Sequence, residues 1–167
     1  GRKFIAQVWE ISVKATIILE HRFLHTLNGK TWTQENSTRS FWNRYLTVFD
    51  EVEVVARSRL VDTVPPGWVR ADGDHVEFRY LPWYVGPREY LAVRKDLIKN
   101  TLATVETAEA LLLRVPSQLA WTIQSFLERT RRPYAVEVIG DPWDVFAPGA
   151  VRHPLRRTPG DRHGPIE

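Results

Sequence analysis

Short apolar segments, most of them rich in β-branched residues, recur along this chain of 167 residues and are separated by longer polar segments. A continuous apolar run of this length is typical of a strand that is covered on both faces of a sheet. Segments of this kind, together with the alternating pattern of residues 75–81, predict five strands, over residues 13–19, 52–61, 75–81, 110–115 and 134–139. The fourth of these segments also fits an extension of the helical segment before it, and both interpretations stay open at this point.

Three of the intervening segments carry apolar residues on one helical face. Residues 39–50 place five large side chains at helical spacing, namely Phe41, Trp42, Tyr45, Leu46 and Phe49, which we interpret as core. The same spacing predicts a long helix over residues 88–108. A third helix is expected to start at Pro116 and Ser117 and to close by residue 132 with basic side chains near the negative end of its dipole.

The segments between these elements carry turn signals. Residues 25–38 are mostly polar and contain Asn28-Gly29, which fits either a small hairpin or a mobile loop, and residues 62–74 form a Pro/Gly loop. Strands that alternate with helices predict an α/β domain whose parallel sheet has helices on both faces. The carboxyl ends of such strands meet at one edge of the sheet, where ligands bind. We therefore expect that edge to be the working surface.

The length of the chain suffices for one ordinary domain with its own core. We expect this domain to cover residues 1–150, although the sequence does not decide whether residues 1–12 are native. Residues 151–167 contain few large apolar side chains. Such a segment buries too little surface to offset the entropy cost of ordering it, so we predict a flexible tail.

Composition restricts the chemistry and the location of the protein. The absence of Cys excludes disulfides and thiolate metal sites. The 23 basic residues are interleaved with 20 acidic ones, for a net charge of +3, so no nucleic-acid partner is expected. The longest apolar run near the start, residues 15–19, is far shorter than the roughly 20 residues that span a bilayer. We find no signal peptide and expect a cytoplasmic protein, with peripheral membrane contact left open.

Several motifs that would define a reaction are missing from the sequence. The first strand is followed by EHRFLHT and not by GxGxxG, which argues against a dinucleotide-binding dehydrogenase domain. Neither the phosphate-binding GxxxxGK[ST] loop nor the GxSxG nucleophile turn occurs. The 5 His form no HExxH motif and no close pair with carboxylates, so we expect no bound metal.

Five segments taken in order carry a resemblance to a known family: EHRF at the end of the first strand, then SFWNRYLTVFDEVEVVAR, LPWYVGP, LLLRVPS and RPYAVEVIGDPWDVFAP. Together they resemble the N-terminal domain of bacterial GT-B glycosyltransferases of the family-4 kind. The most specific pieces are VFDEVEVVAR, LLLRVPS and YAVEVIGDPWD, and the similarity covers residues 15–155.

This resemblance implies a three-layer, Rossmann-like α/β fold that is one half of a two-domain enzyme. In such enzymes the N-terminal domain binds the acceptor, and a C-terminal domain, which this sequence lacks, binds the nucleotide-sugar donor. The reaction implied is transfer of a sugar to a hydroxyl acceptor without a further cofactor. The partners implied are a sugar or glycan acceptor and the donor-binding domain, and the chain is expected to be inactive alone.

The candidate substrate-binding residues lie at the ends of the predicted strands: His21, Arg57, Arg114, Ser117, Asp141, Trp143 and Asp144. Arg57 and Arg114 offer planar donors for hydroxyls or phosphates, or each forms an ion pair with a neighbouring carboxylate such as Asp141. His21 either touches a sugar or is satisfied by the backbone. No residue is assigned a catalytic role.

Each candidate in the later segments also has a structural alternative. Ser117 fits the N-cap of a helix, which is its ordinary role at such a position. Trp143 could stack on a sugar ring or pack in the core, and Asp141 could bind hydroxyls or cap a turn.

A rival interpretation is a free-standing, non-catalytic α/β module that binds a carbohydrate or a protein. The sequence names neither the donor sugar, the acceptor, the pathway nor the oligomeric state, and it does not distinguish a retaining from an inverting reaction.

Overall fold

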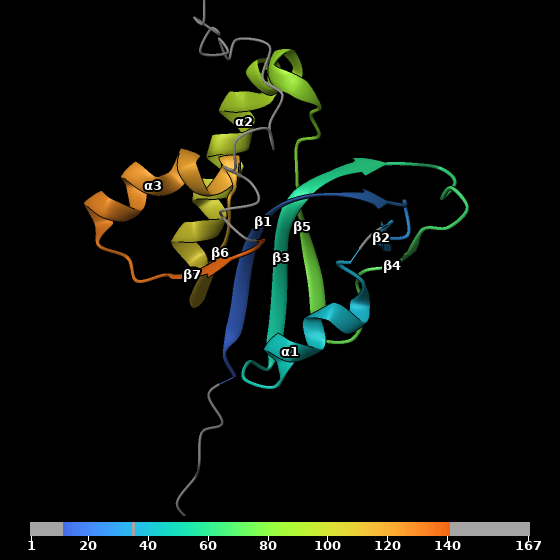
Figure 1. Cartoon of the computed structure of the whole chain (residues 1–167), viewed down its shortest axis with the longest axis horizontal. Helices are drawn as coiled ribbons and strands as arrows, with labels where there is room; N and C mark the ends of the chain where they lie inside the picture. Colours follow the sequence, from blue (N-terminus) through green and yellow to red (C-terminus); the bar gives the residue numbers. More distant parts are fainter. Residues whose placement is uncertain (1–11, 35, 141–167) are drawn as a thin grey trace, which may run out of the picture.

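Five parallel strands form the centre of the sheet in this computed structural model, which describes residues 12–34 and 36–140. They are β1 (Lys14–His25), β3 (Glu51–Leu60), β5 (Val76–Leu81), β6 (Ala110–Val115) and β7 (Ala135–Val138). Their order across the sheet is β5–β3–β1–β6–β7 (Figure 1). Numbered along the chain, this is the 3-2-1-4-5 order of doubly wound sheets, in which the winding reverses between the first and fourth strands. The predicted strands and their parallel arrangement are confirmed, and residues 110–115 form a strand.

The sheet also has an antiparallel extension, which the sequence analysis did not predict. β1 continues beyond residue 19, turns at Thr26–Lys30 and pairs with β2 (Thr31–Thr33), which in turn pairs with β4 (Val69–Arg70). The expectation of a purely parallel sheet, with β1 ending at residue 19 and a plain loop at residues 62–74, was therefore wrong. The local sequence did not indicate this extension. Its segments are mostly polar, and β2 and β4, which pair with each other, are distant in the chain. The hairpin interpretation of residues 25–38 is confirmed.

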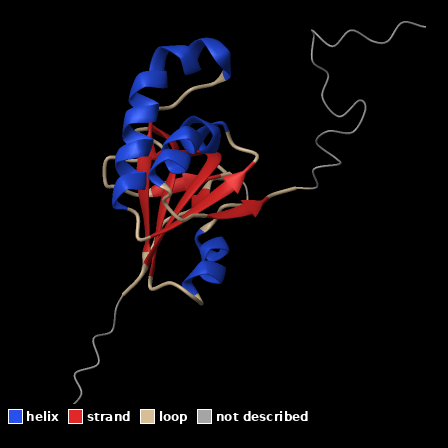
Figure 2. Cartoon of the chain, turned by 90° about the vertical axis from the view of Figure 1, so that its left-hand side faces the viewer, coloured by secondary structure: helices blue, strands red, loops and turns tan. Residues whose placement is uncertain are grey.

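Helices cover both faces of this sheet. The 3-10 helix η1 (Arg39–Trp42) and helix α1 (Asn43–Leu46) lie on one face, and helices α2 (Gly86–Thr107) and α3 (Gln118–Thr130) pack on the other (Figure 2). The predicted helix over residues 39–50 is shorter than expected. The backbone after Leu46 turns back instead, because the Asp50 carboxylate accepts a hydrogen bond from the Val13 N–H at 2.8 Å.

Alternation along β1 and β3 divides the buried side chains between two cores. Ile17 and Val54 face the core beneath η1 and α1, whereas Ile18 and Val55 face the core beneath α2 and α3. Trp42 is fully buried in the first core, and its indole N–H donates to the Ala71 carbonyl at 3.0 Å. The aromatic stripe of residues 41–49 is therefore core, as predicted.

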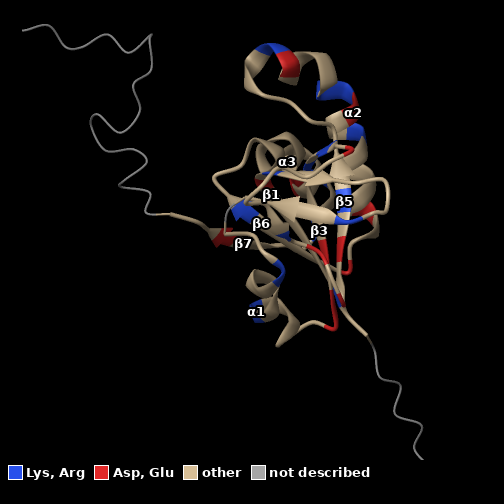
Figure 3. Ribbon diagram, turned by 90° about the vertical axis from the view of Figure 1, so that its right-hand side faces the viewer, with Lys and Arg blue, Asp and Glu red and all other residues tan. Residues whose placement is uncertain are grey.

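The two ends of the sheet differ in charge. At the amino ends of β3 and β5 lie Glu51, Glu53 and Glu77, and the Lys14 ammonium is 3.1 Å from Glu51 and 3.6 Å from Glu77 (Figure 3). The carboxyl ends carry arginines instead. This contrast makes the carboxyl edge the side of the sheet that attracts anions.

Some predictions fall on segments that the structure does not describe. Asp141, Trp143, Asp144, the tail of residues 151–167 and residues 1–11 lie outside the described residues. Among the helices within 12–34 and 36–140, none is both long and apolar enough to cross a membrane.

Candidate functional site

The point at which the sheet winding reverses lies between the carboxyl ends of β1 and β6. A cavity of about 330 Å³ opens there, and Glu20, His21, Arg114 and Pro116 are among the residues that line it. The strand pairing of β1 with β3 is irregular between Ile18 and Arg22. An irregularity of this kind bends a strand and redirects its side chains, so it brings Glu20 and His21 to the cavity.

Glu20 is the centre of a hydrogen-bond network at this point. Its Oε1 accepts from the Tyr84 hydroxyl at 2.8 Å and lies 2.8 Å from an Arg57 guanidinium nitrogen. Its Oε2 accepts from the Ser117 hydroxyl at 3.2 Å and from the Leu119 N–H at 3.1 Å. The carboxylate therefore lies at the amino end of α3, where the helix dipole favours a negative charge.

Arg57 does not line the cavity but pairs with Glu20, which does. Its side chain is only 9% exposed, and it also donates to the backbone carbonyls of Tyr84 at 3.0 Å and Glu20 at 3.2 Å. The guanidinium carbon is 4.2 Å from the centre of the Tyr84 ring. Burial and the hydrogen bond to Glu20 raise the pKa of the Tyr84 phenol, so this group stays protonated and donating. Arg57 thus forms the ion pair that was its structural alternative, with Glu20 as the partner.

Arg114 belongs to a second network, around Glu137. Arg114 Nε donates to Glu137 Oε2 at 3.0 Å, and the Tyr45 hydroxyl and Arg44 each donate to the same carboxylate at 2.5 Å. Burial alone would raise the pKa of Glu137, but the hydrogen bond from Tyr45 and the charges of Arg114 and Arg44 lower it below its ordinary value. Sequence analysis did not single out Glu137. The available signal was an acidic residue within a predicted strand, β7, which pairs with β6, the strand that carries Arg114.

The remaining candidates within the described residues are His21 and Ser117. His21 Nε2 lies 2.9 Å from the Thr33 hydroxyl, and its ring packs edge-on against Phe23 at 4.6 Å between centroids. Ser117 is the N-cap of α3, as its structural alternative predicted, because its hydroxyl accepts from the Ala120 N–H at 3.1 Å. The structure thus brings His21 and Arg114 to one cavity, whereas Arg57 and Ser117 support its wall.

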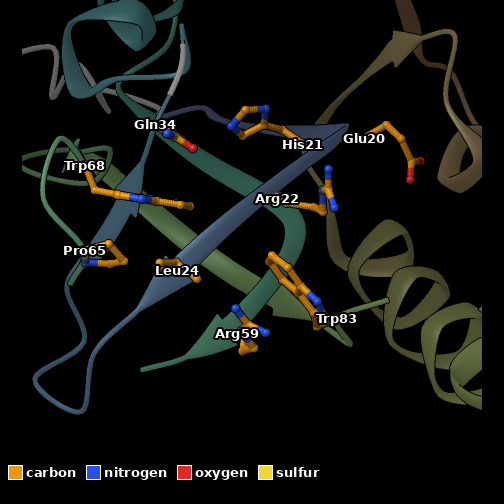
Figure 4. A pocket seen from close by; sticks show the side chains of 9 residues that line it. All are labelled: Glu20, His21, Arg22, Leu24, Gln34, Arg59, Pro65, Trp68 and Trp83. Carbon is orange, nitrogen blue, oxygen red and sulfur yellow. The ribbon is translucent and has the colours of Figure 1, made fainter. Parts of the chain in front are cut away.

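A larger cleft of about 490 Å³ adjoins this cavity and shares Glu20 and His21 with it (Figure 4). We call it the outer cleft. Its wall includes Arg22, Arg59, Trp68 and Trp83, which come from β1, β3, the loop before β4 and the segment after β5. Sequence analysis expected the ligand site at this edge of the sheet but proposed neither Arg22 nor Trp83 as a site residue. It also missed Arg59 and Trp68. The only local signal was for Trp68, a large aromatic residue in a polar Pro/Gly loop.

These two adjoining hollows suit a ligand with hydroxyl groups and flat, partly apolar faces. They offer imidazole, amide and guanidinium groups for hydrogen bonds, and indole rings for stacking. Within the part of the chain that the structure describes, no three His, Asp or Glu side chains gather as metal ligands would.

Comparison with known proteins gives one informative similarity. The chain is 28% identical over 111 residues to Protein CapJ of Staphylococcus aureus, and the match covers 65% of this chain and 28% of CapJ. The chain therefore corresponds to little more than a quarter of the length of that protein. No protein-family model matches the chain. No solved structure matches it either.

Proposed function

We propose that this chain is the acceptor-binding N-terminal domain of a glycosyltransferase that acts in glycan biosynthesis. The complete enzyme would transfer a sugar from a nucleotide-sugar to a hydroxyl group of the acceptor, and a separate C-terminal domain would bind the donor. The observation that carries the proposal is the position of the Glu20 carboxylate at the amino end of α3, at the winding reversal of the sheet.

Doubly wound domains that bind nucleotides place a phosphate at a helix amino end near this reversal. Here the Leu119 N–H and the Ser117 hydroxyl already donate to Glu20. A diphosphate would have to displace a carboxylate that Arg57 neutralises and Tyr84 also binds. The amino end of α3 is therefore already occupied and does not favour a nucleotide diphosphate, which agrees with an acceptor-side domain.

The strand order and the similarity to Protein CapJ add support. The 3-2-1-4-5 order fits a Rossmann-like half of a GT-B enzyme, with its ligand at the carboxyl edge. The distant similarity to CapJ supports a place in glycan biosynthesis.

In this proposal the domain contributes binding and orientation. His21 lies on the wall that the two hollows share, so it is well placed to hold an acceptor hydroxyl in a fixed direction. Fixing the acceptor converts the encounter with the donor into a reaction between positioned groups. Stabilisation of the leaving diphosphate would come from the donor-binding domain.

The proposal is tested by calorimetry on the 167-residue chain with neutral and acidic oligosaccharides and with uridine and guanosine diphosphate sugars. We expect millimolar binding of at least one oligosaccharide, at about −4 kcal/mol, and weaker or no binding of every nucleotide-sugar. His21→Ala is expected to weaken oligosaccharide binding, whereas Arg94→Gln on the exposed surface of α2 serves as the control. Binding of a nucleotide-sugar near micromolar, about −8 kcal/mol, would contradict an acceptor-side domain.

A further inference from the structure

We propose that the outer cleft selects an acceptor glycan that carries an anionic group, a carboxylate or a phosphate, and that Arg22 and Arg59 bind this group beside Trp83. The inference rests on the proposed function, because it specifies the class of acceptor that the site takes.

The first observation is that these two arginines have no acidic partner. Neither Arg22 nor Arg59 forms a salt bridge or a side-chain hydrogen bond with any residue that the structure describes, and both are exposed. The other arginines of the described strands, Arg57, Arg70, Arg79 and Arg114, are each paired with a carboxylate. The two strand arginines without an acidic partner therefore both line the outer cleft.

The second observation is that both guanidinium groups share one aromatic ring. The guanidinium carbon of Arg59 is 4.8 Å and that of Arg22 is 5.8 Å from the centre of a Trp83 ring. Contact with an indole face holds a cation in place but leaves its N–H groups free to donate. Two cations near one ring repel each other, and an anion that accepts hydrogen bonds from both removes this repulsion.

The third observation is that the described residues that line the cleft offer no free negative charge. Glu20 is the only acid among those described lining residues, and its carboxylate is bound by Arg57, Tyr84, Ser117 and the Leu119 N–H. The acids of β3 and β5 lie at the other end of the sheet (Figure 3). An anionic ligand therefore meets attraction here without a compensating repulsion.

The rest of the cleft indicates that the anion is attached to a sugar. Figure 4 shows Trp68 and Pro65 on one side of β1 and Trp83 on the other, with Gln34 and His21 along the top. Half-buried indole rings stack on sugar faces, and an amide and an imidazole bind hydroxyl groups. Two arginines suit one anionic group, whereas a nucleic acid needs a line of cations along many phosphates.

The experiment compares pairs of ligands that differ only in charge. Binding of the 167-residue chain is measured for an oligomer of galacturonic acid and for its methyl ester, and for a phosphorylated oligosaccharide and its dephosphorylated form. We expect the charged member of at least one pair to bind about tenfold more tightly, an advantage that falls as salt is added. The pair that shows the advantage identifies the group as carboxylate or phosphate.

Variants assign the preference to the two arginines. The double variant Arg22→Gln/Arg59→Gln should lose the charge preference, so that it binds the charged and the neutral member of a pair equally. Arg94→Gln removes one positive charge from the exposed surface of α2 and should leave the preference intact. Thermal unfolding at an unchanged temperature shows that each variant is folded.

The possible failures are distinguishable. Equal binding of charged and neutral members by the unchanged chain overturns this inference and leaves the acceptor-side function standing. Absence of binding to every oligosaccharide overturns both. Tighter binding of a single-stranded oligonucleotide than of any charged oligosaccharide overturns the inference in favour of a nucleic-acid site. If the double variant keeps the charge preference, the assignment to Arg22 and Arg59 is wrong, because other residues then bind the anionic group.

Discussion

Individual charged side chains at the carboxyl edge of the sheet differ mainly in whether a partner already binds them. Arg57 is buried and paired with Glu20, so its loss would leave a poorly solvated carboxylate at the amino end of α3. Arg22 and Arg59 are exposed and, among the described residues, paired with no carboxylate. This difference separates side chains that maintain the site from those that are available to a ligand.

Glu137 gives a test at this scale, because its folded pKa is lowered from an ordinary value of 4.5. A group with a depressed folded pKa adds stability that is fully present above the unfolded pKa and is lost as the pH falls through the folded pKa. Glu137→Gln should therefore reduce the free energy of unfolding by about 2 kcal/mol at neutral pH, since it removes a charged acceptor of three hydrogen bonds.

The measurement is urea denaturation of both proteins between about pH 6 and about pH 3. The difference in the free energy of unfolding should shrink as the pH falls, because the unfolded state takes up the proton first and the folded state follows as the pH approaches the lowered folded pKa. A difference that stays constant with pH would show that the carboxylate charge is not what stabilises the protein here.

At the scale of elements, the extension of β1 shapes the outer cleft. β1 carries Arg22 beyond the end of its pairing with β6 while still pairing with β3, and Gln34 follows β2, the strand with which β1 forms the hairpin. The turn of this hairpin depends on Gly29, whose φ of 78° lies in the left-handed region. Backbone conformation at one turn thus affects the position of a binding surface.

Gly29→Ala should lower the free energy of unfolding by about 1 kcal/mol, because a side chain is strained at this φ. No atom lies within 4 Å of the position that a Cβ would occupy, so steric contact adds nothing to this cost. Gly29→Asn is the matched comparison and should cost less, since Asn adopts the left-handed region more readily. Urea denaturation measures both, and equal losses for the two variants would contradict the backbone explanation.

At the scale of the whole molecule, one sheet joins two cores. β1 and β3 send alternate side chains into the core beneath α1 and into the core beneath α2 and α3. If either core unfolds, it exposes strands that also form part of the other core. The two cores are therefore expected to unfold together, as one cooperative unit.

This argument predicts a single unfolding transition. Near-ultraviolet circular dichroism, dominated by the clustered aromatic residues around Trp42, should change at the same urea concentration as the far-ultraviolet signal of α2 and α3. The amide protons that exchange most slowly should be those of β1 and β3. Two separated transitions would show that the cores are independent.

Local pattern alone was enough to predict the central sheet and most helices. The five parallel strands begin within one residue of their predicted starts, because apolar runs or an alternating apolar pattern mark each of them in the sequence. Ser117 occupies the N-cap that its position before an apolar helix indicated, and Trp42 is core as its spacing required. The family resemblance and the proposed reaction remain predictions.

What the sequence by itself determined about this protein is therefore the positions of the five central strands and of the two long helices, since these depend on neighbours a few residues apart; their alternation along the chain indicated the parallel sheet. Only the tertiary structure decided which polar groups meet. Glu20 contacts Arg57 and the amino end of α3, and Arg59 contacts Trp83. These residues are far apart in the chain, and local sequence patterns do not predict contacts of this kind. Strand crossovers and the irregularity in β1 bring these residues together, so the occupied helix end and the unpaired arginines became visible only in the folded molecule.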